Sequence, residues 1–188
     1  MMLSMAKVPV YLTRARMVAR GQTIDTTLVQ EVDCTYRETV QSAAFYRALR
    51  LDARQKIAEG HPKSAWYLQI EDGIQRMHPF HLGVAIILGC ILGTLSGGFD
   101  SELQEQMNGF AREIYGYVPM VQKWRPLGAS YMMVAVMMAW IGTDDPALKG
   151  TLQAVYTDLH NDFPLEPSSE TDLDTLERSR QRLLTLGL

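Results

Sequence analysis

The chain has 188 residues, of which 47% are hydrophobic, and a formal net charge of −3 at pH 7. This length and composition predict one compact domain with a substantial core. The negative charge argues against a surface that coats nucleic acid without sequence preference, because such binding neutralises many phosphates.

Location and redox state follow from the N-terminus and the cysteines. The first residues contain no apolar segment of signal-peptide length, which predicts a cytoplasmic protein. Cys34 and Cys90 are far apart in the chain, and no histidine stands at zinc-binding spacing from either. We therefore expect no disulfide framework and no structural zinc.

The first half of the chain reads as alternating strands and helices. Valines alternate around Pro9 in Lys7–Leu12, and aromatic and β-branched residues dominate Trp66–Ile70, so both segments are predicted strands. Tyr36–Leu49 has an apolar helical face, and the apolar run Phe80–Leu95 is typical of a buried helix.

The second half shows only helix signals. A capping box is predicted at Ser101 with Gln104, and Asp145 followed by proline is typical of another helix start. An apolar helix is expected at Leu127–Trp140 and a last helix at Glu170–Leu186. We expect an α/β (α+β) fold, with residues 1–98 as the core and residues 99–188 as a helical extension packed on it.

Two stretches, 77–99 and 127–143, contain no Asp, Glu, Lys or Arg and approach the length of a membrane span. The strictly apolar part of the first is only Leu82–Leu95, and runs of that length are usually buried core helices. We expect core helices, with membrane spans as the alternative. Peripheral association at the cytoplasmic face of the inner membrane also stays open.

A phosphate-binding corner is predicted where the second strand would meet the apolar helix. The intervening residues include Gly73, Ile74, Gln75 and Arg76, and the glycine permits a sharp reversal. Free backbone N–H groups at a helix start stabilise an anion, and an arginine adds a bidentate donor. The structural alternative is a surface turn with a solvated arginine.

The Asp-Gly-x-x-Arg pattern, Asp72 to Arg76, resembles the signature of the ParB/sulfiredoxin superfamily. The resemblance implies nucleotide binding by Gly73 and Arg76. Sulfiredoxins have their reactive cysteine directly after the motif glycine, where this chain has Ile74, so peroxiredoxin repair is excluded.

More narrowly, the chain length and the helical second half resemble plasmid fertility-inhibition factors of the Osa type. This resemblance implies ATP hydrolysis and DNA cleavage that block conjugative or T-DNA transfer through a type IV secretion system. The implied cofactors are ATP and Mg²⁺. The implied partners are DNA and type IV secretion or relaxosome components.

Phosphate chemistry needs charge neutralisation and an activated water. We expect Arg76 to neutralise phosphate, Asp72 to position water, and His78 to act as a general acid or base. Glu71 and Asp72 are candidate metal ligands, and His78 with His81 has the spacing of a helical ligand pair. Histidines at a helix start are more often surface or capping residues.

Two other functions stay open. The chain could be a non-enzymatic, ParB-like DNA-binding regulator whose C-terminal helices read a site. It could also be a protein-binding inhibitor of a secretion ATPase that uses the methionine-rich helix or the helix with Gly89, Gly93 and Gly97. The default role of the methionines is core filling, and that of the spaced glycines is close helix packing.

Overall fold

The computed structural model describes residues 2–22, 25–163 and 171–186, and every regular element in these ranges is helical. The predicted α/β fold is therefore wrong for the described residues. The elements are α1 (Met2–Ala19), α2 (Leu28–Ala58), α3 (Ser64–Leu95), α4 (Ser101–Val121), the 3-10 turns η1 (Gln122–Trp124) and η2 (Leu127–Ala129), α5 (Ser130–Gly142), α6 (Pro146–His160) and α7 (Asp172–Leu184).

The predicted first strand, Lys7–Leu12, lies inside α1. Tyr11 and Ala15, four residues apart, are both buried, which is helical rather than alternating spacing. Pro9 lies within the helix. The correction has a simple physical reason: the apolar residues of α1 pack on one side against the core, and this burial outweighs the helix cost of one proline.

The predicted second strand and the turn after it are also helical, because Trp66–Arg76 belongs to α3. Gly73 does not break the helix. Pro79 has no N–H to donate to the Gln75 carbonyl oxygen, and the Tyr131 hydroxyl donates to that oxygen instead, at 3.5 Å. Gly73, where a turn was predicted, and Pro79 are thus both accommodated inside a 32-residue helix.

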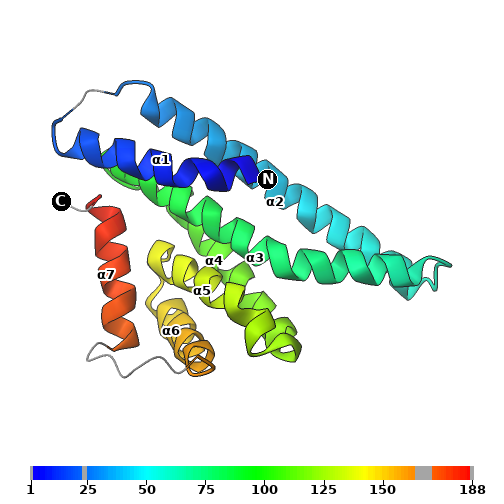
Figure 1. The fold of residues 1–188 in the computed structure, drawn as a ribbon. Coiled ribbons are helices and arrows are strands. Elements are labelled where there is room, and N and C mark those ends of the chain that lie inside the picture. Colours follow the sequence, from blue (N-terminus) through cyan, green and yellow to red (C-terminus); the bar gives the residue numbers. More distant parts are fainter. Residues whose placement is uncertain (1, 23–24, 164–170, 187–188) are drawn as a thin grey trace.

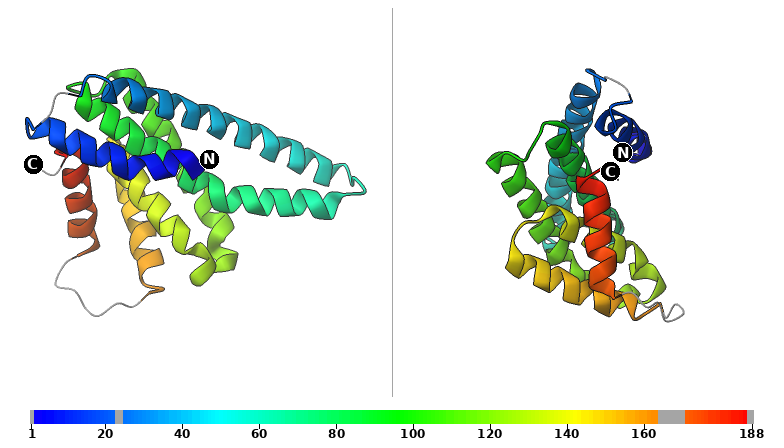
Figure 2. Two further views of the ribbon diagram at one scale, coloured as in Figure 1. Left: turned by 45° about the horizontal axis from the view of Figure 1, so that its top comes forward. Right: turned by 90° about the vertical axis from the view of Figure 1, so that its left-hand side faces the viewer.

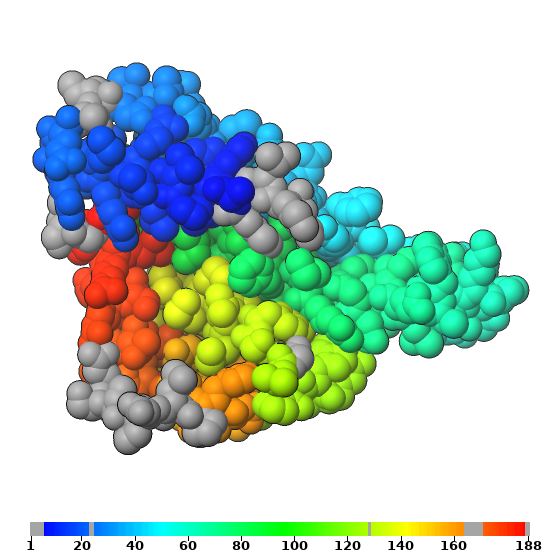
Figure 3. Space-filling model, in the orientation of Figure 1, coloured from blue at the N-terminus to red at the C-terminus, as the bar shows by residue number. Residues whose placement is uncertain are grey.

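Helices α2 and α3 form a long antiparallel hairpin that runs through and beyond the rest of the molecule (Figure 1). Helix α1 lies along the base of the hairpin, α4, α5 and α7 pack against α3 at the same base, and α6 packs on α5 (Figure 2). The other end, around the connection from Ala58 to Ser64, projects from the body (Figure 3). The expected helices Tyr36–Leu49 and Phe80–Leu95 are confirmed as parts of this hairpin.

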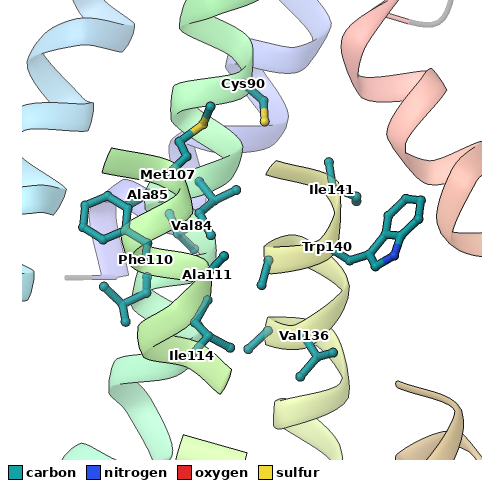
Figure 4. Packing of buried hydrophobic residues seen from close by; sticks show 14 of the residues in the cluster. Val84, Ala85, Cys90, Met107, Phe110, Ala111, Ile114, Val136, Trp140 and Ile141 are labelled. Atoms are coloured by element: carbon teal, nitrogen blue, oxygen red, sulfur yellow. The ribbon is translucent and has the colours of Figure 1, made fainter. Parts of the chain in front are cut away.

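The core lies where α3, α4 and α5 meet (Figure 4). Close approach depends on small residues: a Cβ at Gly142 would lie 2.1 Å from Ile86 Cγ2, and one at Gly89 would lie 2.9 Å from Met107 Sδ. Met132 and Met138 are buried. These contacts confirm that Met132 and Met138 fill the core and that Gly89 serves close packing, while Met133 and Met137 are partly buried against the core.

The helical second half is confirmed, with shifted boundaries. Asp100, rather than Ser101, caps α4, and its side chain accepts a hydrogen bond from the Leu103 N–H. Asp145 caps α6 as predicted. Helix α7 begins later than the predicted Glu170, after the Thr171 cap, and residues 164–170 lie outside the described ranges.

Among the described residues, α3 is the one helix long and apolar enough to cross a membrane. Within the protein, 72% of its most apolar window is buried. This burial is typical of a core helix.

Candidate functional site

The predicted phosphate-binding residues, Gly73 to Arg76, lie in the interior of α3. A helix interior offers no free backbone N–H, because each one donates to the carbonyl four residues earlier. The strand–turn–helix corner expected here is therefore absent. Phosphate binding by these residues stays a prediction, but the strand–turn–helix geometry from which it was inferred is not present in this segment.

The charged side chains of this segment point to different partners. Glu71 accepts hydrogen bonds from Arg54 and Gln75. Asp72 Oδ1 lies 3.0 Å from Lys123 Nζ. Within the described ranges, no group of three or more His, Cys, Asp or Glu side chains could hold a metal ion. The structure thus does not bring a third such ligand to the predicted pair Glu71 and Asp72.

The remaining members of the motif have structural surroundings. Ile74 and Gln75 are buried against the body. Arg76 lies over the Trp124 ring, 4.7 Å from the ring centroid, which is a cation–π contact. Gly73 is exposed, and a Cβ added to it would meet nothing within 4 Å. None of these contacts points to a bound nucleotide.

His78 is the buried member of a partly exposed polar cluster that joins three helices. Its Nε2 lies 2.9 Å from Glu113 Oε1 on α4, and Arg47 of α2 donates to the other Glu113 oxygen at 2.6 Å. The hydrogen bonds from His78 and Arg47, together with the Arg47 charge, outweigh desolvation and lower the pKa of Glu113 to about 2. His78 is fully buried. The cluster therefore connects α2, α3 and α4, and no reactant reaches the imidazole in this conformation.

His81 is turned to a different partner and is not paired with His78. Its Nε2 lies 3.0 Å from the Thr39 carbonyl oxygen on α2. Burial lowers the pKa of His81. Nε2 of His78 and Nε2 of His81 thus contact different groups, and among the described residues neither belongs to a group of three or more side chains that could hold a metal ion.

Large apolar side chains are exposed along the outside of the hairpin, some level with its base and some toward its projecting end. The exposed fractions are 63% for Phe45, 69% for Leu51, 54% for Trp66, 51% for Leu68 and 43% for Met77. Single exposed apolar residues are common on protein surfaces, but several on one element are not. These five residues are the most unusual surface feature of the hairpin.

The five residues divide between two sides. At the base, α1 contacts one side: Tyr11 bonds Thr35 of α2 at 2.9 Å, and Leu12 lines a groove with Ile87 of α3. Steps of three and four residues share a helix face. On α2, such steps lead from Thr35 to Phe45. On α3, they lead from Ile87 to Trp66, through Val84, Phe80, Met77, Gly73 and Ile70. We call the projecting part of this side the open α1 side.

The opposite side is the one that α4 and η1 contact at the base, through Arg47 with Glu113 and Asp72 with Lys123. Leu51 lies four residues after Arg47 on α2, and Leu68 lies four residues before Asp72 on α3. We call this projecting part the open α4 side. Both sides of the hairpin thus expose apolar groups beyond the body.

Comparison of the chain with protein-family models, with curated proteins and with solved structures finds no significant match. The site therefore rests on geometry. A sequence signal for it existed: Trp66, Ile70, Gly73, Met77 and Phe80 follow alternating steps of four and three residues, the spacing of a helical seam. Reading Trp66–Ile70 as a strand concealed this signal.

Proposed function

We propose that this protein is a non-enzymatic interaction protein that binds another protein chain through the projecting end of the α2–α3 hairpin. The observation that carries the proposal is the exposure of Leu51, Trp66 and Leu68 toward the projecting end of the hairpin, with Phe45 and Met77 exposed nearer its base. Helix faces with apolar anchors at three- and four-residue steps are a common mode of protein recognition.

The hairpin is suited to this role because ion pairs connect its helices to each other and to α4. Arg54 pairs with Glu71 within the hairpin, and Arg47 pairs with Glu113 at its base. A prearranged surface loses less conformational entropy on binding than a flexible one. Exposed Trp66 has the chemistry of a binding hot spot, since aromatic residues dominate such positions.

ATP hydrolysis and DNA cleavage stay predictions of the sequence, and the resemblance behind them implied an α/β core. They are tested with purified protein, ATP, Mg²⁺ and linear DNA, comparing wild type with Arg76→Ala and Asp72→Ala. Our proposal predicts neither phosphate release nor DNA shortening. Activity that both substitutions abolish would contradict it.

The proposal is tested by site-specific photo-crosslinking in the cell that produces the protein. A photoreactive residue at Leu68 should give a discrete protein adduct, identified by mass spectrometry. The matched control is the same residue at Leu173 of α7, which is exposed by 44% and lies away from the hairpin. No adduct at Leu68, or equal adducts at both positions, would contradict binding of a different protein through the side of the hairpin on which Leu68 lies.

A further inference from the structure

We infer that the open α1 side of the hairpin binds a second copy of this chain, with the two hairpins antiparallel. The inference rests on the proposed function and names the partner for one of the two open sides. In this arrangement α2 lies on α2 of the partner, α3 lies on α3 of the partner, and the two bodies stand at opposite ends.

The first argument is continuity with α1. At its base, this side of the hairpin is already covered by a helix, through Tyr11 with Thr35 and Leu12 with Ile87. The same α3 stripe continues beyond α1 to Met77 and Trp66, which are exposed. A helical surface from another chain would extend the packing that α1 begins.

The second argument is the match of a large residue with a small one. Trp66 lies four residues before Ile70, about 6 Å along the helix. Gly73 lies three residues after Ile70, about 4.5 Å along the helix. A two-fold axis near Ile70 therefore places each Trp66 opposite the partner's Gly73. The open space around Gly73 suits an indole ring.

Other glycines show why position matters. Gly109 and Gly116 of α4 and Gly150 of α6 also have open space around a Cβ. An exposed glycine in a helix is therefore not by itself a sign of an interface. Gly73 differs because it lies within the apolar stripe, at the position that the two-fold axis places opposite Trp66.

The third argument is charge. Arg54 of α2 pairs with Glu71 of α3, so these two residues lie at the same level along the hairpin. Glu71 is next to Ile70, so Arg54 lies close to the same two-fold axis. Asp52 lies two residues before Arg54 and Lys56 two residues after it, both in three- and four-residue steps from Phe45. Within its own chain Lys56 Nζ lies 3.6 Å from Glu59 Oε2. The antiparallel arrangement places each Asp52 beside the partner's Lys56, so these two charges are complementary across the two-fold axis.

The size of the surface sets the expected strength. The open part of α2 from Phe45 to Ala58 is about 20 Å long, and two adjacent helices are about 20 Å wide. The surface is thus about 400 Å² per copy, about half of that in a standard interface. We expect a reversible dimer that dissociates on dilution.

The experiment is sedimentation of the purified full chain from low micromolar to several hundred micromolar concentration. Exposed Cys34 is replaced by serine in every sample, so that no intermolecular disulfide contributes. The chain should change from monomer to dimer across this range. Trp66→Ala should weaken dimerisation by about tenfold or more, whereas Leu173→Ala should not change it.

The glycine gives a matched pair of variants. Gly73→Ala removes space opposite Trp66 and should weaken the dimer, while raising the thermal midpoint of the dilute monomer through helix propensity. Gly109→Ala should raise the midpoint without affecting the dimer. Equal dimerisation of both variants would contradict the antiparallel arrangement.

The charge pair tests the register directly. Asp52→Lys alone, or Lys56→Asp alone, places like charges together in a homodimer and should weaken it. A mixture of these two single variants restores both opposite-charge contacts in the heterodimer and should recover dimerisation. Failure of the mixture to recover would overturn the register.

A wild-type chain that stays monomeric at every concentration overturns the inference. The proposed function is judged separately by the Leu68 probe on the open α4 side. An adduct there with a different protein, together with a monomeric chain, would leave the proposed function standing. A monomeric chain with no adduct would remove both.

Discussion

His78 and Glu113 are 35 residues apart in the chain, and the His78 Nε2 atom lies 2.9 Å from the Glu113 Oε1 atom. Arg47 of α2 pairs with the same carboxylate, so one acidic group on α4 connects two helices of the hairpin. The hairpin projects as a unit because its base is held by this cluster as well as by apolar packing. This relationship yields a prediction about acid stability.

Glu113→Gln should destabilise the protein by up to about 3 kcal/mol at neutral pH, since the native pKa of Glu113 lies at about 2, below its ordinary 4.5. A lowered carboxyl pKa contributes stability that is complete above pH 4.5 and is lost as the pH falls from 4.5 toward 2. The free energies of unfolding of wild type and variant should therefore converge in acid. Urea denaturation across this range measures the difference, and Glu102→Gln, an exposed carboxyl of α4, is the control. A difference that does not change with pH would contradict the assignment.

Asn108→Ala should destabilise the protein by about 2 kcal/mol, because it leaves the buried Thr143 hydroxyl without its acceptor. The Asn108 Oδ1 atom accepts from the Thr143 hydroxyl at 2.8 Å, and its Nδ2 donates to Asp144 at 2.8 Å. These bonds hold the connection between α5 and α6. Chemical denaturation gives the measurement. Gln181→Ala, which removes one exposed bond within α7, serves as the comparison and should change stability much less.

Gly142→Ala and Gly150→Ala should have opposite effects. An added methyl at Gly142 meets Ile86 Cγ2 at 2.1 Å, so the core must shift, at a typical cost of about 1–3 kcal/mol. At Gly150 a methyl meets nothing within 4 Å, and the gain in helix propensity should raise stability by up to about 1 kcal/mol. Thermal unfolding of both variants checks the prediction. A neutral Gly142→Ala would show that the packing of α3 on α5 is looser than described.

The native protein should react with a thiol reagent at Cys34 and not at Cys90. Cys34 is exposed, whereas Cys90 is buried, and burial raises the pKa of its thiol to about 12. The thiolate is the reactive form, so Cys90 should react only after unfolding. Counting modified thiols with and without denaturant measures this. Native Cys34→Ser should show no rapid reaction, and rapid modification of Cys90 would disprove its burial.

Helix signals in the second half were predictable because they are local. Asp145 followed by Pro146 starts α6 as expected, since an N-cap and a first-turn proline act within one turn. The apolar run Phe80–Leu95 was likewise recognisable as a buried helix. These segments have one plausible local structure, so neighbouring helices did not change it.

The first half could not be predicted in the same way. Trp66–Ile70 has strand propensity, but β-propensity is a weak preference, and packing of α3 along α2 overrides it. His78 was picked out by its chemistry, yet its partner Glu113 lies on α4 and no spacing rule connects them. The exposed stripe with Trp66 and Met77 was missed because its helical period becomes visible only when Gly73 is read as part of a helix.

The sequence by itself determined that the second half is helical, that the methionine-rich segment fills a core, and where capped helices begin. These features depend on residues within a few positions of each other. Only the tertiary structure decided that Lys7–Leu12 and Trp66–Arg76 are helical, that His78 meets Glu113, and which apolar residues stay uncovered. The physical reason is that helix and strand differ little in local free energy for such segments, whereas burial against distant helices contributes much more.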